Sequence, residues 1–196
     1  MYSLEQSIEF ESQANPHSWF LVASELHEQA ELLKEECTSK IIRHDRISGS
    51  SFSWGTSNRT VILLAGFALE NLLKGFLIYE HPSYVKNGFL SKKLQTHKLT
   101  KLAKESTYLP YKSQSYNTLK YFEDGLESWA RYPCGLNWAQ TKDPNLLTKK
   151  VWNNYLWLVG VYEARFKKIM LNGWEGPHHF EGSFEITGDW LQKRRS

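Results

Sequence analysis

The stretch NRTVILLAGFALENLLKGFLIYE, from Asn58 to Glu80, is the longest apolar segment of the sequence and decides the fold. Placed on a helical period, it is apolar on nearly every side, as expected for a helix with neighbours all round. Two glycines and three polar residues interrupt the run, which falls short of the roughly 20 apolar residues that cross a bilayer. The sequence therefore predicts a buried core helix of a bundle, with no membrane anchor.

Two charged residues lie on this apolar surface. Glu70 and Lys74 are one helical turn apart, and the residues three, four or seven positions from Glu70 are otherwise Leu63, Phe67 and Leu77. A buried charge is costly unless it is paired, and Lys74 is within reach of Glu70 on the same helix face. We therefore expect a buried Glu70 that is bonded to Lys74 or to a cation from a neighbouring helix.

Composition indicates one globular domain. The 196 residues are 41% hydrophobic and 14% aromatic, which excludes a disordered chain. The formal net charge of +3 permits phosphate ligands without demanding them. A solvated helix face explains the most basic region equally well, and that region comprises Lys92, Lys93, Lys98, Lys101 and Lys104.

Neither cysteines nor histidines form a metal-binding pattern. Cys37 and Cys134 have no disulfide or zinc spacing, and the N-terminus lacks the regions of a secretion signal. His178, His179 and Asp189 are conceivable metal ligands, but adjacent histidines in a tail are usually surface residues. We expect a cytoplasmic protein without a metal or cofactor.

The chain before the core helix predicts one long helix and a reversal. Apolar residues recur at steps of three and four from Trp19 to Cys37, with Ser18 as N-cap and Glu31 among the residues facing water. Residues 1–14 are either a loose arm or a short helix. The Ser- and Gly-rich residues 48–58 read as a loop, so the long helix and the core helix should form an antiparallel hairpin.

Three further helices are predicted after the His81-Pro82 stop. A short basic helix follows Thr96 as its N-cap, an amphipathic helix covers residues 114–130, and the last helix covers about 145–171, with Asp143 near its start. Together they give an all-α class, a helical bundle over residues 1–172.

The last segment changes character. Residues 173–196 contain four glycines and a proline, with a brief alternation around Phe180, Phe184 and Ile186. This pattern predicts an irregular C-terminal tail that allows a small hairpin.

The polar residues Glu70, Lys74, His97 and Arg131 come from three helices or their ends and form the candidate site. Glu70 needs a partner, and His97 or Arg131 can supply one from a neighbouring helix. Two interpretations stay open: an internal ion-pair network that fixes helix register, or a functional polar cleft. The common enzyme motifs, such as a phosphate loop or a nucleophile elbow, are absent.

Three stretches around these residues resemble the HEPN superfamily, small helical domains named for higher eukaryotes and prokaryotes nucleotide-binding. They are FALENLLKGFLI (67–78), THKLTKL (96–102) and WARYP (129–133), and their order and spacing cover about residues 15–172. The resemblance implies an up-and-down bundle of four or five helices that is frequently a homodimer.

Many HEPN proteins are metal-independent ribonucleases with an arginine followed, after four to six residues, by a histidine. Arg131 matches the arginine, but the three positions for the histidine hold Leu136, Asn137 and Trp138. Asn137 can form hydrogen bonds but cannot move a proton near neutral pH. By this pattern the chain lacks the catalytic histidine.

We therefore expect a non-catalytic binding or regulatory module, with Arg131, Tyr132, Asn137 and Trp138 lining a groove of a homodimer. A nucleotide or RNA is the candidate ligand, because arginine binds phosphate and aromatic rings stack on bases. The alternative is a ribonuclease toxin of a toxin–antitoxin or defence system, with Arg131 and a histidine from elsewhere, most plainly His97. A third hypothesis is a structural partner of a larger defence protein.

Overall fold

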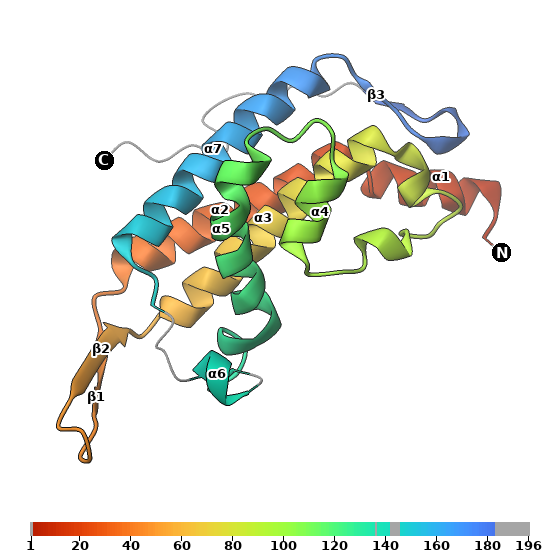
Figure 1. Cartoon of the computed structure of the whole chain (residues 1–196). Coiled ribbons are helices and arrows are strands. Elements are labelled where there is room, and N and C mark those ends of the chain that lie inside the picture. The colour runs from red at the N-terminus through yellow and green to blue at the C-terminus, as the bar shows by residue number, and fades with distance from the viewer. Residues whose placement is uncertain (1, 136, 142–145, 183–196) are drawn as a thin grey trace.

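The computed structural model describes residues 2–135, 137–141 and 146–182, which form a mostly helical bundle around α3 (Figure 1). The central helix α3 (Asn58–Glu80) contacts α2 (Pro16–Glu36), α4 (Leu99–Glu105), α5 (Lys112–Asp124) and α7 (Lys149–Met170). The predicted all-helical class is therefore confirmed in outline, with two short hairpins added to it.

Helix α3 has the bounds that its apolar pattern predicts. It ends at Glu80 because Pro82 disfavours helical geometry in His81. By length and composition alone the helix is long enough to cross a membrane, but 78% of its most apolar window is buried inside the protein. Its apolar surface is accordingly used to pack against the other helices.

Helices α2 and α3 are antiparallel, as predicted (Figure 1), and pack closely against each other at Gly75. A Cβ atom there would lie 2.5 Å from Phe20 Cε2, so only glycine fits. The N-cap of α2 is Asn15, whose side chain accepts a hydrogen bond from the Ser18 amide at 3.0 Å. The prediction of Ser18 as N-cap was wrong because Pro16, fixed near helical φ, starts the helix earlier.

The buried face of α2 is rotated from the predicted one. Val22 was expected inside but is 44% exposed, whereas Phe20 and His27 are buried. Glu31 was expected to face water but is buried, with its carboxylate 3.5 Å from His27 Nε2. The face that docks on α3 and α7 decides this orientation, and α2 offers apolar residues on more than one side.

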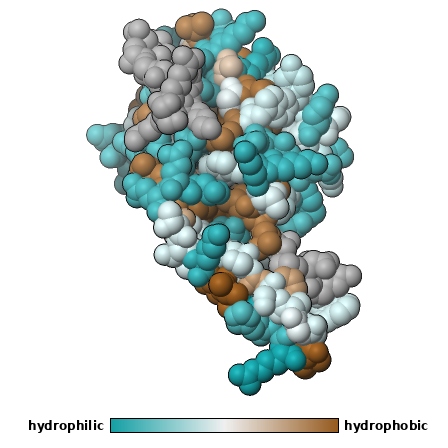
Figure 2. Space-filling model, turned by 90° about the vertical axis from the view of Figure 1, so that its left-hand side faces the viewer, coloured by the Kyte–Doolittle hydropathy of each residue, from teal (hydrophilic) through white to brown (hydrophobic). Residues whose placement is uncertain are grey.

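The predicted loop at residues 48–58 is largely a β-hairpin. Strand β1 (Lys40–His44) pairs antiparallel with β2 (Ser51–Gly55), with Ile41 opposite Trp54. The hairpin projects from one end of the bundle and forms its narrow lower end in Figure 2, where Ile47 is fully exposed. The loop prediction was wrong because β2 has only a brief alternation, with Phe52 and Trp54 partly buried between serines, inside a stretch rich in Ser and Gly.

Both chain ends that the structure describes pack on the bundle. Residues 1–14, left as an arm or a helix, contain α1 (Leu4–Gln13) behind a Ser3 capping box. The small hairpin allowed after residue 172 is confirmed: β3 (Trp174–Glu175) pairs with β4 (Glu181–Gly182) across the turn η4 (Pro177–His179). Trp174 is buried, and its Nε1 donates to the Ile78 carbonyl at 3.3 Å. Phe184, Ile186 and Asp189 lie outside the described residues.

Several helix bounds differ from prediction. Helix α4 begins at Leu99, so Thr96 is not its N-cap, although Thr96 Oγ1 accepts from the Lys98 amide at 3.2 Å. The predicted helix 114–130 is α5 followed by a π-helical turn, η3 (Gly125–Trp129). Helix α7 begins at Lys149, capped by Thr148, and Asp143 lies outside the described residues. Short elements fill the remaining loops: η1 (Pro82–Val85), η2 (Lys92–Leu94) and α6 (Trp138–Thr141).

Candidate acid–base site around Glu70

Glu70 and Lys74 form a buried ion pair on α3, as the sequence predicts. Glu70 is 5% exposed and Lys74 is 7% exposed, and Lys74 Nζ lies 2.6 Å from Glu70 Oε1. The side chains meet because residues four apart lie on one face of a helix. Lys74 Nζ also lies 5.7 Å from the centre of the Trp19 ring on α2. The pair is therefore enclosed between α2 and α3.

His97 bonds the second oxygen of the same carboxylate. Its Nδ1 lies 2.7 Å from Glu70 Oε2, and its side chain remains 42% exposed. Because an ionised carboxylate only accepts hydrogen bonds, Nδ1 carries the proton and Nε2 is left as an acceptor. His97 was expected to be the first residue of a helix, but it precedes α4 by two residues. From there its ring reaches across to α3.

Arg131 completes the cluster from the end of η3. One of its terminal nitrogens, Nη2, lies 3.5 Å from His97 Nε2. Its guanidinium carbon is 5.9 Å from the centre of the Phe67 ring, which packs edge-on against the His97 ring. We call Glu70, Lys74, His97 and Arg131 together the Glu70 cluster. Its members run in a line from the buried ammonium to the exposed guanidinium.

A π-helical turn brings Arg131 to this place. In η3 the Ala130 amide donates to the Gly125 carbonyl, five residues back, at 3.3 Å. Gly125 allows η3 to touch α3, because a Cβ atom there would lie 2.7 Å from Ile62 Cγ2. Arg59 of α3 then holds the chain after Arg131 by donating to the Tyr132 carbonyl at 2.5 Å. Such turns occur frequently at functional sites.

Sequence reasoning missed Glu123, which fixes the start of α4. This buried carboxylate on α5 accepts from the Thr100 amide at 2.9 Å and from Thr100 Oγ1 at 2.7 Å. Burial by itself would raise the Glu123 pKa, but the hydrogen bonds from Thr100 and Lys120 lower it. No spacing in the sequence links Glu123 to Thr100. Since α4 starts here, this contact also helps to place His97.

The other predicted groove residues do not join the cluster within one chain. Tyr132 and Asn137 are exposed, and Trp138 is 77% exposed. Among the described residues, Arg131 has no hydrogen bond or ring contact with Asn137 or Trp138. Of these residues, Arg131 is the one that the structure places against His97.

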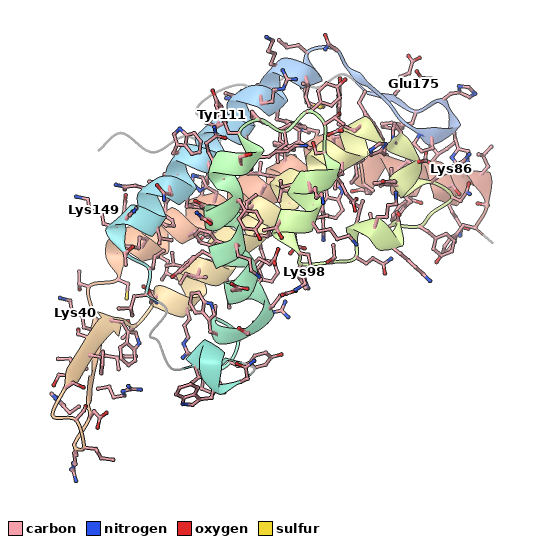
Figure 3. All side chains as sticks on the ribbon, viewed as in Figure 1. Lys40, Lys86, Lys98, Tyr111, Lys149 and Glu175 are labelled. Atoms are coloured by element: carbon pink, nitrogen blue, oxygen red, sulfur yellow. The ribbon has the colours of Figure 1, made fainter. Side chains whose placement is uncertain are left out.

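The five lysines of the basic region are exposed on η2 and α4, as a solvated face requires. Lys98, at the start of α4, pairs with Glu127 of η3 beside the cluster (Figure 3). Lys93 Nζ donates to the Tyr84 hydroxyl at 3.0 Å, which raises the Lys93 pKa. Lys101 and Lys104 leave positive charge on the exposed face of α4.

The other titratable groups are dispersed. His178, a discarded metal candidate, bonds Glu11 of α1 through Nδ1 at 2.6 Å. In the part of the chain that the structure describes, no three or more His, Cys, Asp or Glu side chains are grouped to hold a metal ion. Cys37 and Cys134 are both free thiols. Hydrogen bonds from Ser57 and Thr56 lower the Cys37 pKa to about 7.

No family model, curated protein or solved structure matches the chain. The relationship to the HEPN superfamily stays a prediction from the three sequence stretches. Function must therefore be inferred from the contacts of the Glu70 cluster.

Proposed function

We propose that this chain is a HEPN-like, metal-independent endoribonuclease whose active site is the Glu70 cluster. The observation that carries the proposal is the setting of His97. Its Nδ1 is held by the buried Glu70 carboxylate, while its Nε2 faces Arg131 on the exposed side. A carboxylate bonded to one imidazole nitrogen orients the ring and directs the other nitrogen toward the substrate side.

The cluster has the groups that RNA cleavage needs. His97 Nε2 takes the proton of a 2′-hydroxyl, and the 2′-oxygen forms a bond to phosphorus. The bond from phosphorus to the 5′-oxygen breaks, and the imidazolium returns the proton to that leaving oxygen. Arg131 donates to the phosphate oxygens as negative charge builds up on them. The products are a 2′,3′-cyclic phosphate and a 5′-hydroxyl end.

The geometry favours this alternative over the binding module that the sequence pattern suggests. A binding site accounts for an exposed Arg131 but gives no reason for an oriented histidine next to it. The histidine missing from the 136–138 region is replaced in this proposal by His97, 34 residues before Arg131. Glu70 and Lys74 serve as positioning residues, because they lie behind the imidazole and are buried.

The test is cleavage of a mixed RNA substrate by purified protein in EDTA. Wild type should cleave, and His97→Ala and Arg131→Ala should each lower the rate by about 10²- to 10⁴-fold. His44→Ala is the matched control, since His44 is an exposed histidine on the β1–β2 hairpin. Salt-sensitive RNA binding without cleavage would refute the enzyme and restore the binding module. Cleavage that survives both cluster substitutions would refute the site.

A homodimer through the segment from Arg131 to Trp138 is part of the proposal. Tyr132 and Trp138 expose large rings beside the cluster, and a second copy would cover them. Light scattering at tens of micromolar protein should give the mass of a dimer, and Trp138→Ser should weaken it. A monomeric wild type, or a dimer indifferent to Trp138→Ser, would refute this contact and leave the active site untouched.

A further inference from the structure

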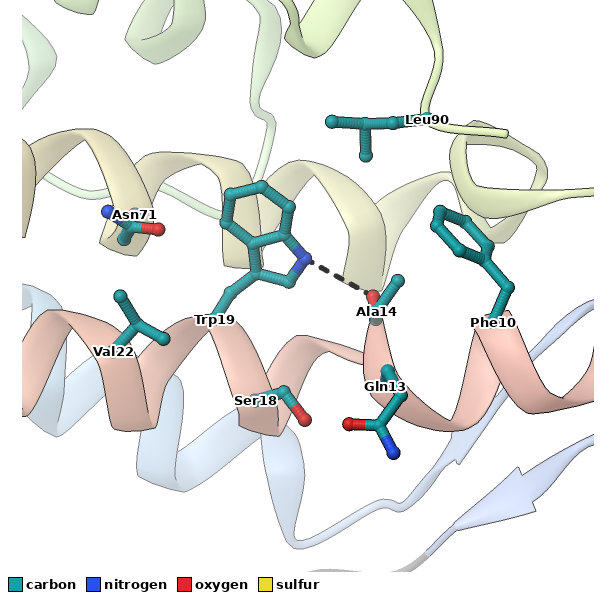
Figure 4. Close-up of a pocket in the computed structure, with 8 residues that line it drawn as sticks. All are labelled: Phe10, Gln13, Ala14, Ser18, Trp19, Val22, Asn71 and Leu90. Atoms are coloured by element: carbon teal, nitrogen blue, oxygen red, sulfur yellow. Dashed lines mark hydrogen bonds between the residues drawn. The ribbon is translucent and has the colours of Figure 1, made fainter. Parts of the chain in front are cut away.

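An apolar pocket adjoins the Glu70 cluster on the α2 side of α3 (Figure 4). It lies between the end of α1, the first turns of α2, α3 and the loop that carries Leu90. Its volume of about 360 Å³ is within the range of roughly 300–1,000 Å³ that is usual for small-ligand sites. None of its lining residues is charged.

Trp19 forms the main wall of the pocket. Its indole Nε1 donates to the Ala14 carbonyl at 3.2 Å, which fixes the ring. Figure 4 shows the indole in the middle of the pocket, with Phe10 and Leu90 toward one end and Val22 toward the other. A flat, apolar ligand would meet an immobilised aromatic surface here. Lys74 Nζ, near the same ring, connects this wall to the cluster.

The polar groups of the pocket are two amides and one hydroxyl, from Gln13, Asn71 and Ser18. Asn71 Nδ2 donates to the Phe67 carbonyl at 2.7 Å, so its side chain is held in place. Amides offer both donors and acceptors, which suit the edge of a planar heterocycle. The ligand class defined by the lining is therefore neutral, flat and apolar on its faces, with hydrogen-bonding groups on its edge.

Lys74 connects the pocket to the proposed phosphate position. Its Nζ lies 2.6 Å from Glu70 Oε1 and 5.7 Å from the centre of the Trp19 ring. Glu70 in turn bonds His97, whose Nε2 faces Arg131. Asn71, which lines the pocket, is one turn of α3 from Phe67, the residue that packs under Arg131.

We propose that this pocket binds an RNA base next to the scissile phosphate, stacked on Trp19 and read along its edge by Asn71 and Gln13. Stacking on a protein ring accepts every base, and the edge contacts select among them. The inference rests on the proposed function, because that function identifies RNA as the source of the base. Base binding itself requires no cleavage, so the two can be tested apart.

The experiment is a titration of ¹⁵N-labelled full-length protein with adenosine, uridine and inorganic phosphate, followed through the tryptophan indole NMR signals. Trp19→Phe identifies the Trp19 signal among the eight tryptophans. We expect a nucleoside to shift the Trp19 signal and phosphate alone to leave it unchanged. Removing the stacking ring in Trp19→Ala should weaken nucleoside binding by about tenfold or more.

A matched pair of substitutions on α2 locates the ligand. Val22 and Leu21 are each 44% exposed, but only Val22 lines the pocket. Val22→Phe should fill the pocket and weaken nucleoside binding by about tenfold, the effect expected when the base loses one stacking surface. Leu21→Phe should leave nucleoside binding unchanged. Asn71→Ala should change the preference between adenosine and uridine while stacking remains.

Three results would overturn the base pocket. They are an unmoved Trp19 signal at millimolar nucleoside, equal binding by the Val22→Phe and Leu21→Phe proteins, and equal binding of toluene, which has no hydrogen-bonding edge. Any of them leaves RNA cleavage as a separate question. Nucleoside binding in a protein that fails to cleave RNA would instead support the pocket and refute the ribonuclease.

Discussion

The pairs His27–Glu31 and His97–Glu70 place the same two chemical groups in opposite settings. His27 is buried between α2 and α7, with Nδ1 2.8 Å from the Tyr155 hydroxyl and Nε2 3.5 Å from Glu31 Oε2. Burial lowers the His27 pKa to about 4. His97 bonds Glu70 more closely, with Nδ1 2.7 Å from Oε2, and its side chain is partly exposed with its second nitrogen facing Arg131.

The difference shows that the presence of a histidine–glutamate pair does not by itself make a candidate site. The histidine must also be accessible to solvent. At neutral pH His27 is uncharged, because burial disfavours the charged form. It serves as a polar core residue, and no substrate can reach it. His97 bonds a buried carboxylate through one ring nitrogen, and the rest of its ring is partly exposed to solvent. Four changes test whether this contrast governs stability and activity.

The largest expected effect is at the carboxylate behind His97. Glu70→Ala strands the ammonium of buried Lys74 and should lower the free energy of unfolding by about 3–5 kcal/mol. Chemical denaturation measures this change in the free energy of unfolding. Glu127→Ala is the control, since its partner Lys98 is largely exposed and such pairs contribute about 0–1 kcal/mol. Equal midpoints for the two variants would show that Glu70 is not a buried ion-pair partner.

The second effect is the pH dependence that His27 confers. Its folded-state pKa of about 4 is below the unfolded value of 6.5, so the unfolded chain binds more protons between these values. The contribution of His27 to stability is complete above pH 6.5 and is lost as pH falls toward 4, by about 3 kcal/mol. Denaturation curves of wild type and His27→Asn between pH 7 and pH 4 measure this loss.

For His27→Asn we expect a flatter pH dependence with cleavage per folded molecule unchanged. An unaltered slope in this variant would mean that His27 is not the buried titrating group. A loss of cleavage without a loss of stability would mean that the core pair, and not only His97, takes part in the chemistry.

The third test concerns the packing of α2 on α3, on which both pairs depend. Gly75→Ala places a Cβ atom 2.5 Å from Phe20 and should cost about 1–3 kcal/mol through overpacking. At Gly160, in the middle of α7, an added Cβ would meet no atom within 4 Å, so Gly160→Ala should gain about 0.5–1 kcal/mol. Thermal melts of the two variants should therefore shift in opposite directions. Shifts of the same sign would contradict the close helix contact.

The smallest effect is at the contact that anchors α4 behind His97. Thr100→Val removes the hydroxyl bond to Glu123 but keeps the amide bond, and should cost about 1 kcal/mol. Thr118→Val on α5 is the control, because the Thr118 hydroxyl has no hydrogen bond within the described ranges. Cleavage should fall in Thr100→Val more than in the control. Identical activities would show that this anchor does not position His97.

Local sequence periodicity was sufficient for the central features of the fold. The bounds of α3 and the Glu70–Lys74 pair were predicted from residues within a few turns of one another, and the antiparallel contact of α3 with α2 from the chain reversal expected between them. These features depend on apolar burial along one helix and on the four-residue spacing of side chains. Such signals are present in any window of the sequence that contains the helix.

The tertiary structure alone decided the features that join distant segments. The strands of the β1–β2 hairpin are short and mostly exposed, and the brief alternation of Phe52 and Trp54 lies in a Ser- and Gly-rich stretch that is typical of a loop. The buried face of α2 was settled by the fit of Phe20 beside Gly75. His97 and Arg131 meet only because α4 starts at Leu99 and η3 adds a π-helical turn, shifts of a residue or two that no sequence pattern encodes. The sequence thus determined the buried Glu70–Lys74 pair within one helix, because its signal is local, and the packing of several helices determined which other polar residues are buried and which face each other and solvent.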